Sequence, residues 1–312
     1  MVHTGQIKIR RGRISGLNFF TAYMYWFILS LLTALAVSSQ DACVKRFFSG
    51  LSPFEMAACP LFYSLPMLAV AAPFIPVPPV GPDFGWTFLL SIPMNGISFI
   101  LYMRAIRESP LSLTIPYLAF TPVFMILTGY LFLGEMPSPT GILGILVICA
   151  GGYTLNIDPA RWHILFPIRA VFRETGSWLM LIVAFLYSFT SVIGKKAILN
   201  SSPLFFSILF FGVFNLLMLF LLRIMKKIRF ATFLAHPVNG SLAGTLFFLH
   251  ILFHGWAISM TKAAYMISVK RLSVLFSIIY GKFIFREERI AIRLGGALLM
   301  LAGTLLITLQ GD

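Results

Sequence analysis

Long apolar runs alternate with short polar breaks along almost the whole chain. A helix that crosses a bilayer needs about 20 mainly apolar residues, and ten runs approach or exceed that length. The proline-rich segment 76–83 must be a loop, because proline cannot continue a helix. The pattern predicts an all-α integral membrane protein with ten transmembrane helices, at about 21–44, 53–76, 84–106, 110–133, 138–157, 177–198, 203–224, 240–261, 263–285 and 290–310.

Composition supports the membrane class. Hydrophobic residues make up 59% of the 312 positions and charged residues only 11%, whereas soluble domains carry about 25% charged residues. The longest polar interval, 158–176, is itself half apolar, which leaves no room for a catalytic domain outside the membrane. No nucleotide-binding loop or nucleophile motif is present, so we predict no enzyme, no cofactor and no direct drive by ATP.

The net charge of +14 comes from basic residues that lie mainly in short loops and in a basic N-terminal tail, 1–20. Such residues suit the anionic head groups of a lipid bilayer, and no basic motif with exposed aromatics indicates nucleic acid. The three cysteines, Cys43, Cys59 and Cys149, all fall in apolar segments without metal-ligand spacing, so we expect buried thiols.

The chain contains an internal repeat. A shift of 150 places Lys45 on Lys195, and a shift of 152 places Glu135 on Glu287. The second shift also pairs Gly144 with Gly296 and Gly151 with Gly303, and we expect these glycines to permit close helix packing. The predicted domains are a tail, 1–20, a first repeat, 21–157, a connecting loop, 158–176, and a second repeat, 177–310.

Several motifs in both halves resemble one family. They are LSPFE at 51–55, YMRAIR at 102–107, TPVF at 121–124, LGE at 133–135, GILGILVICAG at 141–151, FRE at 285–287 and LGGALLMLAG at 294–303. With them the chain resembles the EamA-type ten-helix transporters of the drug/metabolite transporter superfamily. The resemblance implies two five-helix repeats of opposite membrane orientation and a transport function, but it does not identify the cargo. Family members often have Trp-Gly in span 1 and Arg in span 2, which this chain lacks.

Polar residues inside the apolar runs are the candidate binding residues, because they are expensive in a bilayer. In the third span Ser91, Asn95, Ser98 and Tyr102 form one helical stripe, and the repeat places His250 and His254 on Ser98 and Tyr102. They can line a cavity or form hydrogen bonds between helices. The spacing of the histidines would also suit zinc, but no companion ligand is evident, so we predict no metal site.

The ninth span carries the strongest candidates. Lys270, Ser273 and Ser277 share one helical face, and Arg271 lies about 100° around the helix. The two basic side chains either line a cavity or extend to the membrane interface.

Asp41 is the carboxylate that lies well inside a span, and it can couple transport to a proton or cation. A structural ion pair with Lys45, four residues on, is the alternative. In the second half Ser191 lies at the position of Asp41, with Tyr187 one turn earlier.

The predicted function is a secondary transporter or facilitative exporter of a small polar metabolite, such as an amino acid, in the cell (inner) membrane. Because the buried titratable groups are mainly basic, we expect an anionic or zwitterionic substrate. A flippase for lipids or lipid-linked sugars and a non-transporting helper subunit stay open, and so does a homodimer. The positive-inside rule puts both termini outside, whereas the family usually has them in the cytoplasm, so the orientation stays open as well.

Overall fold

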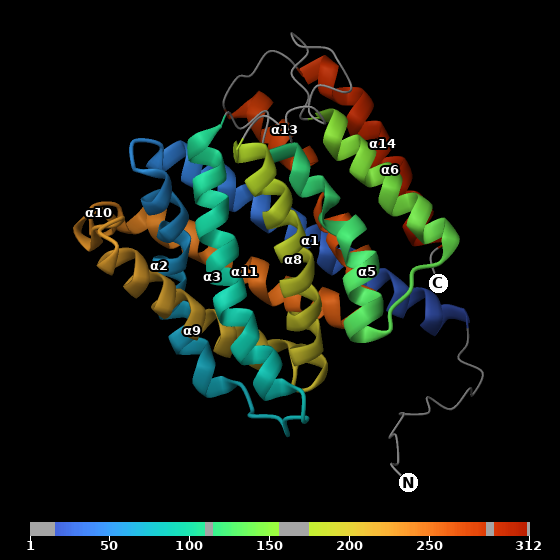
Figure 1. The fold of residues 1–312 in the computed structure, drawn as a ribbon, viewed down its shortest axis with the longest axis horizontal. Coiled ribbons are helices and arrows are strands. Elements are labelled where there is room, and N and C mark those ends of the chain that lie inside the picture. The colour runs from blue at the N-terminus through green and yellow to red at the C-terminus, as the bar shows by residue number, and fades with distance from the viewer. Residues whose placement is uncertain (1–15, 110–114, 156–174, 285–289, 311–312) are drawn as a thin grey trace.

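The computed structural model describes residues 16–109, 115–155, 175–284 and 290–310 (Figure 1). Within these ranges the chain is helical and contains no strand. Residues 1–15 of the predicted tail, residues 158–174 of the predicted connecting loop, and Glu287 lie outside the described residues.

In the first half α1 spans Gly16–Phe48 and α2 spans Pro53–Ala71, followed by the short helix η1, Ala72–Phe74. The other elements of this half are α3 (Phe84–Glu108), η2 (Ile115–Phe120), α5 (Thr121–Leu133) and α6 (Pro139–Leu155). In the second half lie α8 (Thr175–Leu199), α9 (Pro203–Ile224), α10 (Phe230–Leu234), α11 (Pro237–Met260), α12 (Ala263–Lys270), α13 (Ser273–Phe283) and α14 (Ile290–Gln310).

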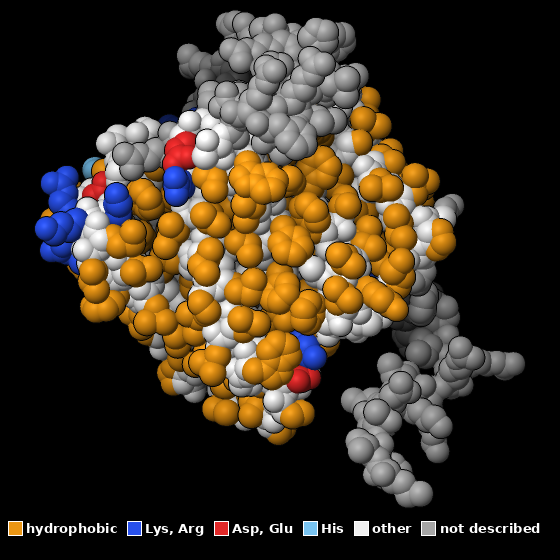
Figure 2. Space-filling view, viewed as in Figure 1, with side chains coloured by type: hydrophobic (Ala, Val, Ile, Leu, Met, Phe, Trp, Pro, Cys, Tyr) orange, Lys and Arg blue, Asp and Glu red, His pale blue; other side chains and the backbone are white. Residues whose placement is uncertain are grey.

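Seven helical stretches of the described residues are long and apolar enough to cross a membrane. Shorter apolar helices cover 117–133, 139–154 and 295–309, within three further ranges that the sequence predicts as spans. The protein is therefore an all-helical membrane protein. Figure 2 shows the corresponding surface, where hydrophobic side chains cover most of one face and charged side chains lie near its edges.

Local sequence explains where α2 and α9 begin. Pro53 and Pro203 occupy the first helical position, where a missing N–H is harmless. The Ser52 hydroxyl accepts a hydrogen bond from the Glu55 backbone N–H, and the Glu55 carboxylate accepts one from the Ser52 N–H. This reciprocal cap fixes the start of α2.

Helices from the two halves pack against each other in pairs. α6 lies along α14, α1 along α11 and α3 along α8. At the α6–α14 contact, a Cβ on Gly144 would lie 2.8 Å from the Gly303 carbonyl oxygen, and a Cβ on Gly151 would lie 2.6 Å from that of Gly296. Only glycine allows these backbones to approach so closely, as the sequence predicts.

Candidate functional site

The helical stretches at 115–133 and 263–283 each contain a break in the regular α-helix, at positions that the repeat makes equivalent, although the chain stays helical across it. η2 ends at Phe120 and α5 begins at Thr121, while α12 ends at Lys270 and α13 begins at Ser273. The shift of 152 places Thr121 on Ser273. At the second break the backbone stays hydrogen-bonded, because the Arg271 N–H donates to the Ile267 carbonyl and the Val274 N–H donates to the Arg271 carbonyl. The side chains at the breaks are therefore the groups that a ligand could meet.

Arg271 connects the two breaks. Its Nη2 donates a hydrogen bond to the Thr121 hydroxyl over 2.7 Å. Its Nε is buried and has no hydrogen-bond partner among the described residues. A guanidinium with a free donor is well suited to bind an anion, because its donors form a planar fork.

Lys270 lies beside a pair of histidines on α11. Its ammonium lies 3.5 Å from Nδ1 of His254, and the His254 and His250 ring centroids are 6.0 Å apart. His250 Nδ1 is buried without a hydrogen-bond partner in the described part of the chain. This arrangement does not favour a metal, since the Lys270 charge faces the ligand nitrogen, and the described residues hold no cluster of three metal-binding side chains.

Tyr102 on α3 and Tyr187 on α8 complete the basic cluster. Both phenols lie close enough to Arg271 for its charge to act on them. Asp41 on α1 interacts electrostatically with Lys270 and with Tyr102, yet its side chain is exposed. These interactions place the Asp41 carboxylate near Tyr102 of α3 and Lys270 at the end of α12.

The predicted pair of Asp41 with Lys45 is not among the ion pairs that join described residues. Whether Asp41 couples transport to a cation or proton stays a prediction.

The structure does not bring every predicted site residue into this cluster. The Ser98 hydroxyl donates to the Met94 carbonyl, and the Asn95 amide donates to the Ser91 carbonyl, so both donors serve their own helix. Ser277 donates to the carbonyl of Ser273 and shares a 2.9 Å hydrogen bond with Ser38 of α1. No hydrogen bond between described residues joins these side chains to Lys270 or Arg271.

Two residues of the cluster were not predicted from the sequence. Thr121 accepts the Arg271 hydrogen bond, and its signal was its position opposite Ser273 in the repeat. Cys149 on α6 lies within electrostatic reach of Arg271, and its thiol donates to the Ala119 carbonyl over 2.8 Å. A lone cysteine in an apolar run gives no sequence signal for such a location.

Fold and site together define a multi-pass membrane protein with buried basic groups at the breaks of two helices. Residues 24–157 match the model of the EamA-like transporter family, which belongs to the drug/metabolite transporter superfamily. This match bears out, for the first predicted repeat, the family resemblance read from the sequence.

Comparison with solved structures agrees with this fold. A protein whose structure is titled "Crystal structure of protein" superposes with a TM-score of 0.66 at 15% sequence identity. The match covers 93% of this chain and 98% of the other. A comparison with curated proteins gives no match.

Proposed function

We propose that the protein is a secondary transporter or facilitative exporter of a small anionic or zwitterionic metabolite. The observation that carries the proposal is the adjacent pair Lys270 and Arg271 at the break between α12 and α13. The Nε of Arg271 is buried and has no hydrogen-bond partner among the residues that the structure describes. An unpaired buried cation is costly, so a carboxylate or phosphate that supplies the missing acceptor would bind favourably.

The substrate site would lie between the two repeats, 21–157 and 177–310. Arg271 comes from the second repeat and Thr121 from the first, while Tyr102 and Tyr187 approach from helices that pack on each other. The pairing of α1 with α11 and of α3 with α8 supports ten spans in two inverted repeats, because the repeat exchanges α1 with α8 and α3 with α11. In such transporters one repeat rocks against the other around a central site.

Asp41 is the proposed coupling group. It is exposed and interacts with Lys270, so a change in its charge changes the field at the anion site. A protonated Asp41 would leave the Lys270 charge free for the substrate, whereas an ionised Asp41 would compete for it.

The test is a thermal-shift screen of the purified protein with amino acids, organic acids, nucleosides, sugar phosphates and quaternary amines. A ligand at 100 times its dissociation constant stabilises the folded state by about 2.7 kcal/mol. We expect a shift with an anionic or zwitterionic class that is lost in the double variant Lys270→Ala/Arg271→Ala. Lys282→Ala is the matched control, because Lys282 is exposed near the end of α13.

A shift that persists in the double variant would move the site elsewhere. A shift with quaternary amines alone would contradict an anion site. If no soluble compound shifts the protein, flux assays with lipid substrates in liposomes would test a flippase instead.

A further inference from the structure

We infer that the ion pair between Glu135 and Lys195 is a gate, and that the structure is closed at this gate and open toward the opposite end of the molecule. The inference rests on the proposed transport function for its role in a cycle. The gate residues are different from the proposed substrate-binding residues, however, and the test of the gate needs no substrate.

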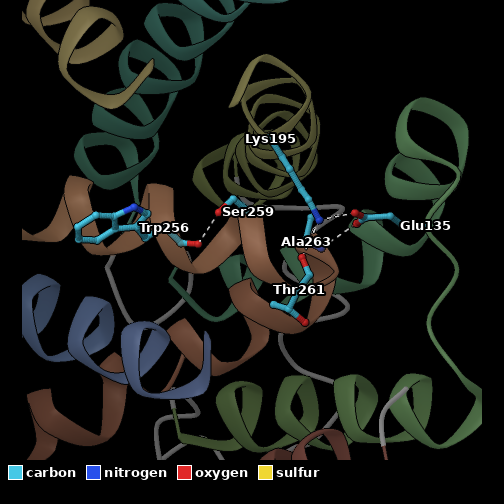
Figure 3. A network of polar contacts seen from close by, with 6 residues as sticks. All are labelled: Glu135, Lys195, Trp256, Ser259, Thr261 and Ala263. Atoms are coloured by element: carbon cyan, nitrogen blue, oxygen red, sulfur yellow. Dashed lines mark hydrogen bonds and ion pairs between the residues drawn. The ribbon is translucent and has the colours of Figure 1, made fainter. Parts of the chain in front are cut away.

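Three segments from both halves of the chain meet at this ion pair (Figure 3). The Lys195 ammonium donates to the Glu135 carboxylate and, over 2.6 Å, to the Thr261 carbonyl. Glu135 also accepts a hydrogen bond from the Ala263 N–H over 2.9 Å, which caps the start of α12. The pair thus ties the end of α5 to α8 and to the junction of α11 with α12.

The pair lies between the proposed site and one end of the molecule. α8 carries Tyr187 at the site and Lys195 eight residues later, about 12 Å along the helix. α5, α8 and α11 all end in this region, so we call it the Glu135 end. The Lys195 side chain is only 4% exposed, so its ammonium is almost completely shielded from solvent in this structure.

The repeat supplies a comparison within the same molecule. The shift of 150 places Lys45 on Lys195 and Asp41 on Ser191. Lys45 and Asp41 are exposed, whereas Lys195 is buried and Ser191 is half-buried. Equivalent positions of the two halves therefore have different access to solvent, as expected when a transporter is open on one side and closed on the other.

The two exposed residues, Asp41 and Lys45, lie toward the end of the molecule opposite Glu135. Cys43, near the end of α1, is 3.8 Å from the carbonyl of Asn239, near the start of α11. Because α11 ends at Thr261, beside the gate, its start is at the other end of the molecule. Asp41 and Lys45 thus belong to the end away from Glu135, and the exposure of Asp41 supports access to the site from that direction.

A second ion pair at the Glu135 end provides a control. Lys196 lies 3.2 Å from Asp83 and joins α8 to the start of α3. Its side chains are 25% and 39% exposed, so solvent already reaches this pair, and its loss should not open a new passage to the site.

The test measures access to a thiol placed one turn inside the gate, in Ser191→Cys. The three native cysteines are buried and give the baseline. A membrane-impermeant maleimide is applied to right-side-out and inside-out vesicles of the full-length protein. Met136→Cys, at an exposed residue next to Glu135, identifies the vesicles that present the Glu135 end.

With the native gate, we expect the thiol at 191 to react from the opposite end and not from the Glu135 end. Lys195→Met or Glu135→Gln should raise its reaction rate from the Glu135 end by about tenfold, as when a minor state becomes a major one. Lys196→Met should leave that rate unchanged. Glu135→Gln retains an acceptor for the Ala263 N–H, so it provides a second gate variant if Lys195→Met does not fold.

An unchanged rate in a gate variant that elutes as a folded protein would overturn the inference, as would an equal rise in Lys196→Met. Reaction from the Glu135 end in the native background would also overturn it. None of these results bears on whether the protein binds a substrate, so a failed gate and a failed transport function remain distinguishable.

Discussion

Arg271 concentrates the chemistry of the site in one side chain. One of its nitrogens is held by Thr121 and another is buried without a partner among the described residues. The Thr121 hydrogen bond orients the guanidinium across the boundary between the two halves. A side chain held in this way is preorganised to bind an anion.

The first residue-scale prediction concerns Thr121→Val, which removes the acceptor from Arg271 while preserving the side-chain shape. We expect a loss of about 1–3 kcal/mol in unfolding free energy, because a buried donor loses its partner. Thr128→Val is the control on the same helix, since among the described residues the Thr128 hydroxyl bonds only to the Phe124 carbonyl of its own helix. Chemical unfolding in detergent measures both variants, and an equal loss would show that the Arg271 contact contributes nothing.

A second prediction concerns the glycines between α6 and α14. Gly151→Ala and Gly303→Ala each place a methyl group 2.6 Å from a carbonyl oxygen of the facing helix. We expect each to destabilise the protein by about 1–3 kcal/mol through overpacking. In Gly295→Ala the methyl group meets open space, so this variant should be neutral or slightly stabilising. Thermal unfolding of the purified variants checks this order.

The sequence indicated the charged residues of the candidate site more directly than its residues with hydroxyl or amide side chains. Charges such as Lys270 and Asp41 stand out in an apolar run because a bilayer penalises them. Ser98 and Asn95 share a helical face, but a helix lets such side chains bond to its own carbonyls. Spacing indicates which face a residue occupies, but it does not show whether its donor is already used.

The sequence pattern did not predict the breaks within two of the helical stretches. The runs 110–133 and 263–285 were predicted as continuous, because every window in them is apolar. The structure divides each run near Thr121 and Ser273. Pro122 is compatible with either outcome, since proline kinks a helix or begins one.

At the level of elements, the start of α3 is linked to the end of α8 by polar contacts. The Trp86 indole donates to the Asp83 carboxylate over 2.8 Å, and Lys196 lies 3.2 Å from the same carboxylate. These hydrogen bonds and the Lys196 charge hold the pKa of Asp83 below its ordinary value of 3.8.

This contact should make stability depend on pH in the acid range. A carboxyl with a lowered folded-state pKa contributes stability above its ordinary pKa, and the contribution is lost as the pH falls through the folded value. We therefore expect the native protein to lose stability below about pH 3.8 more steeply than Asp83→Asn. Melting temperatures across an acid series test this, and parallel curves would contradict it.

At the scale of the whole molecule, the fold separates charge from an apolar surface. Arg229, 83% exposed in the loop before α10, is one of several basic residues at the end opposite Glu135. Lys195 instead is buried in an ion pair, so it does not count as a loop charge. When Lys195 is left out of the basic loop residues, the excess of positive charge at the end opposite Glu135 becomes larger.

An even number of spans predicts that both termini and Met136 lie on one side of the membrane and Arg229 on the other. Epitope tags at the two ends and single cysteines at 136 and 229, probed in oriented vesicles, measure this directly. Tags on opposite sides would contradict the ten-span arrangement. The side that faces the cytoplasm would settle the conflict between the charge rule and the family pattern.

The glycine contact between α6 and α14 also limits how the two halves of the sequence can evolve. Gly144 meets Gly303 and Gly151 meets Gly296, so each close approach has one partner from each half of the gene. A larger residue acquired in one half would push both contacts apart, and no change within that half could restore them. Along this contact, as at the Arg271–Thr121 hydrogen bond and the Lys195–Glu135 ion pair, the two halves of the gene must therefore evolve together.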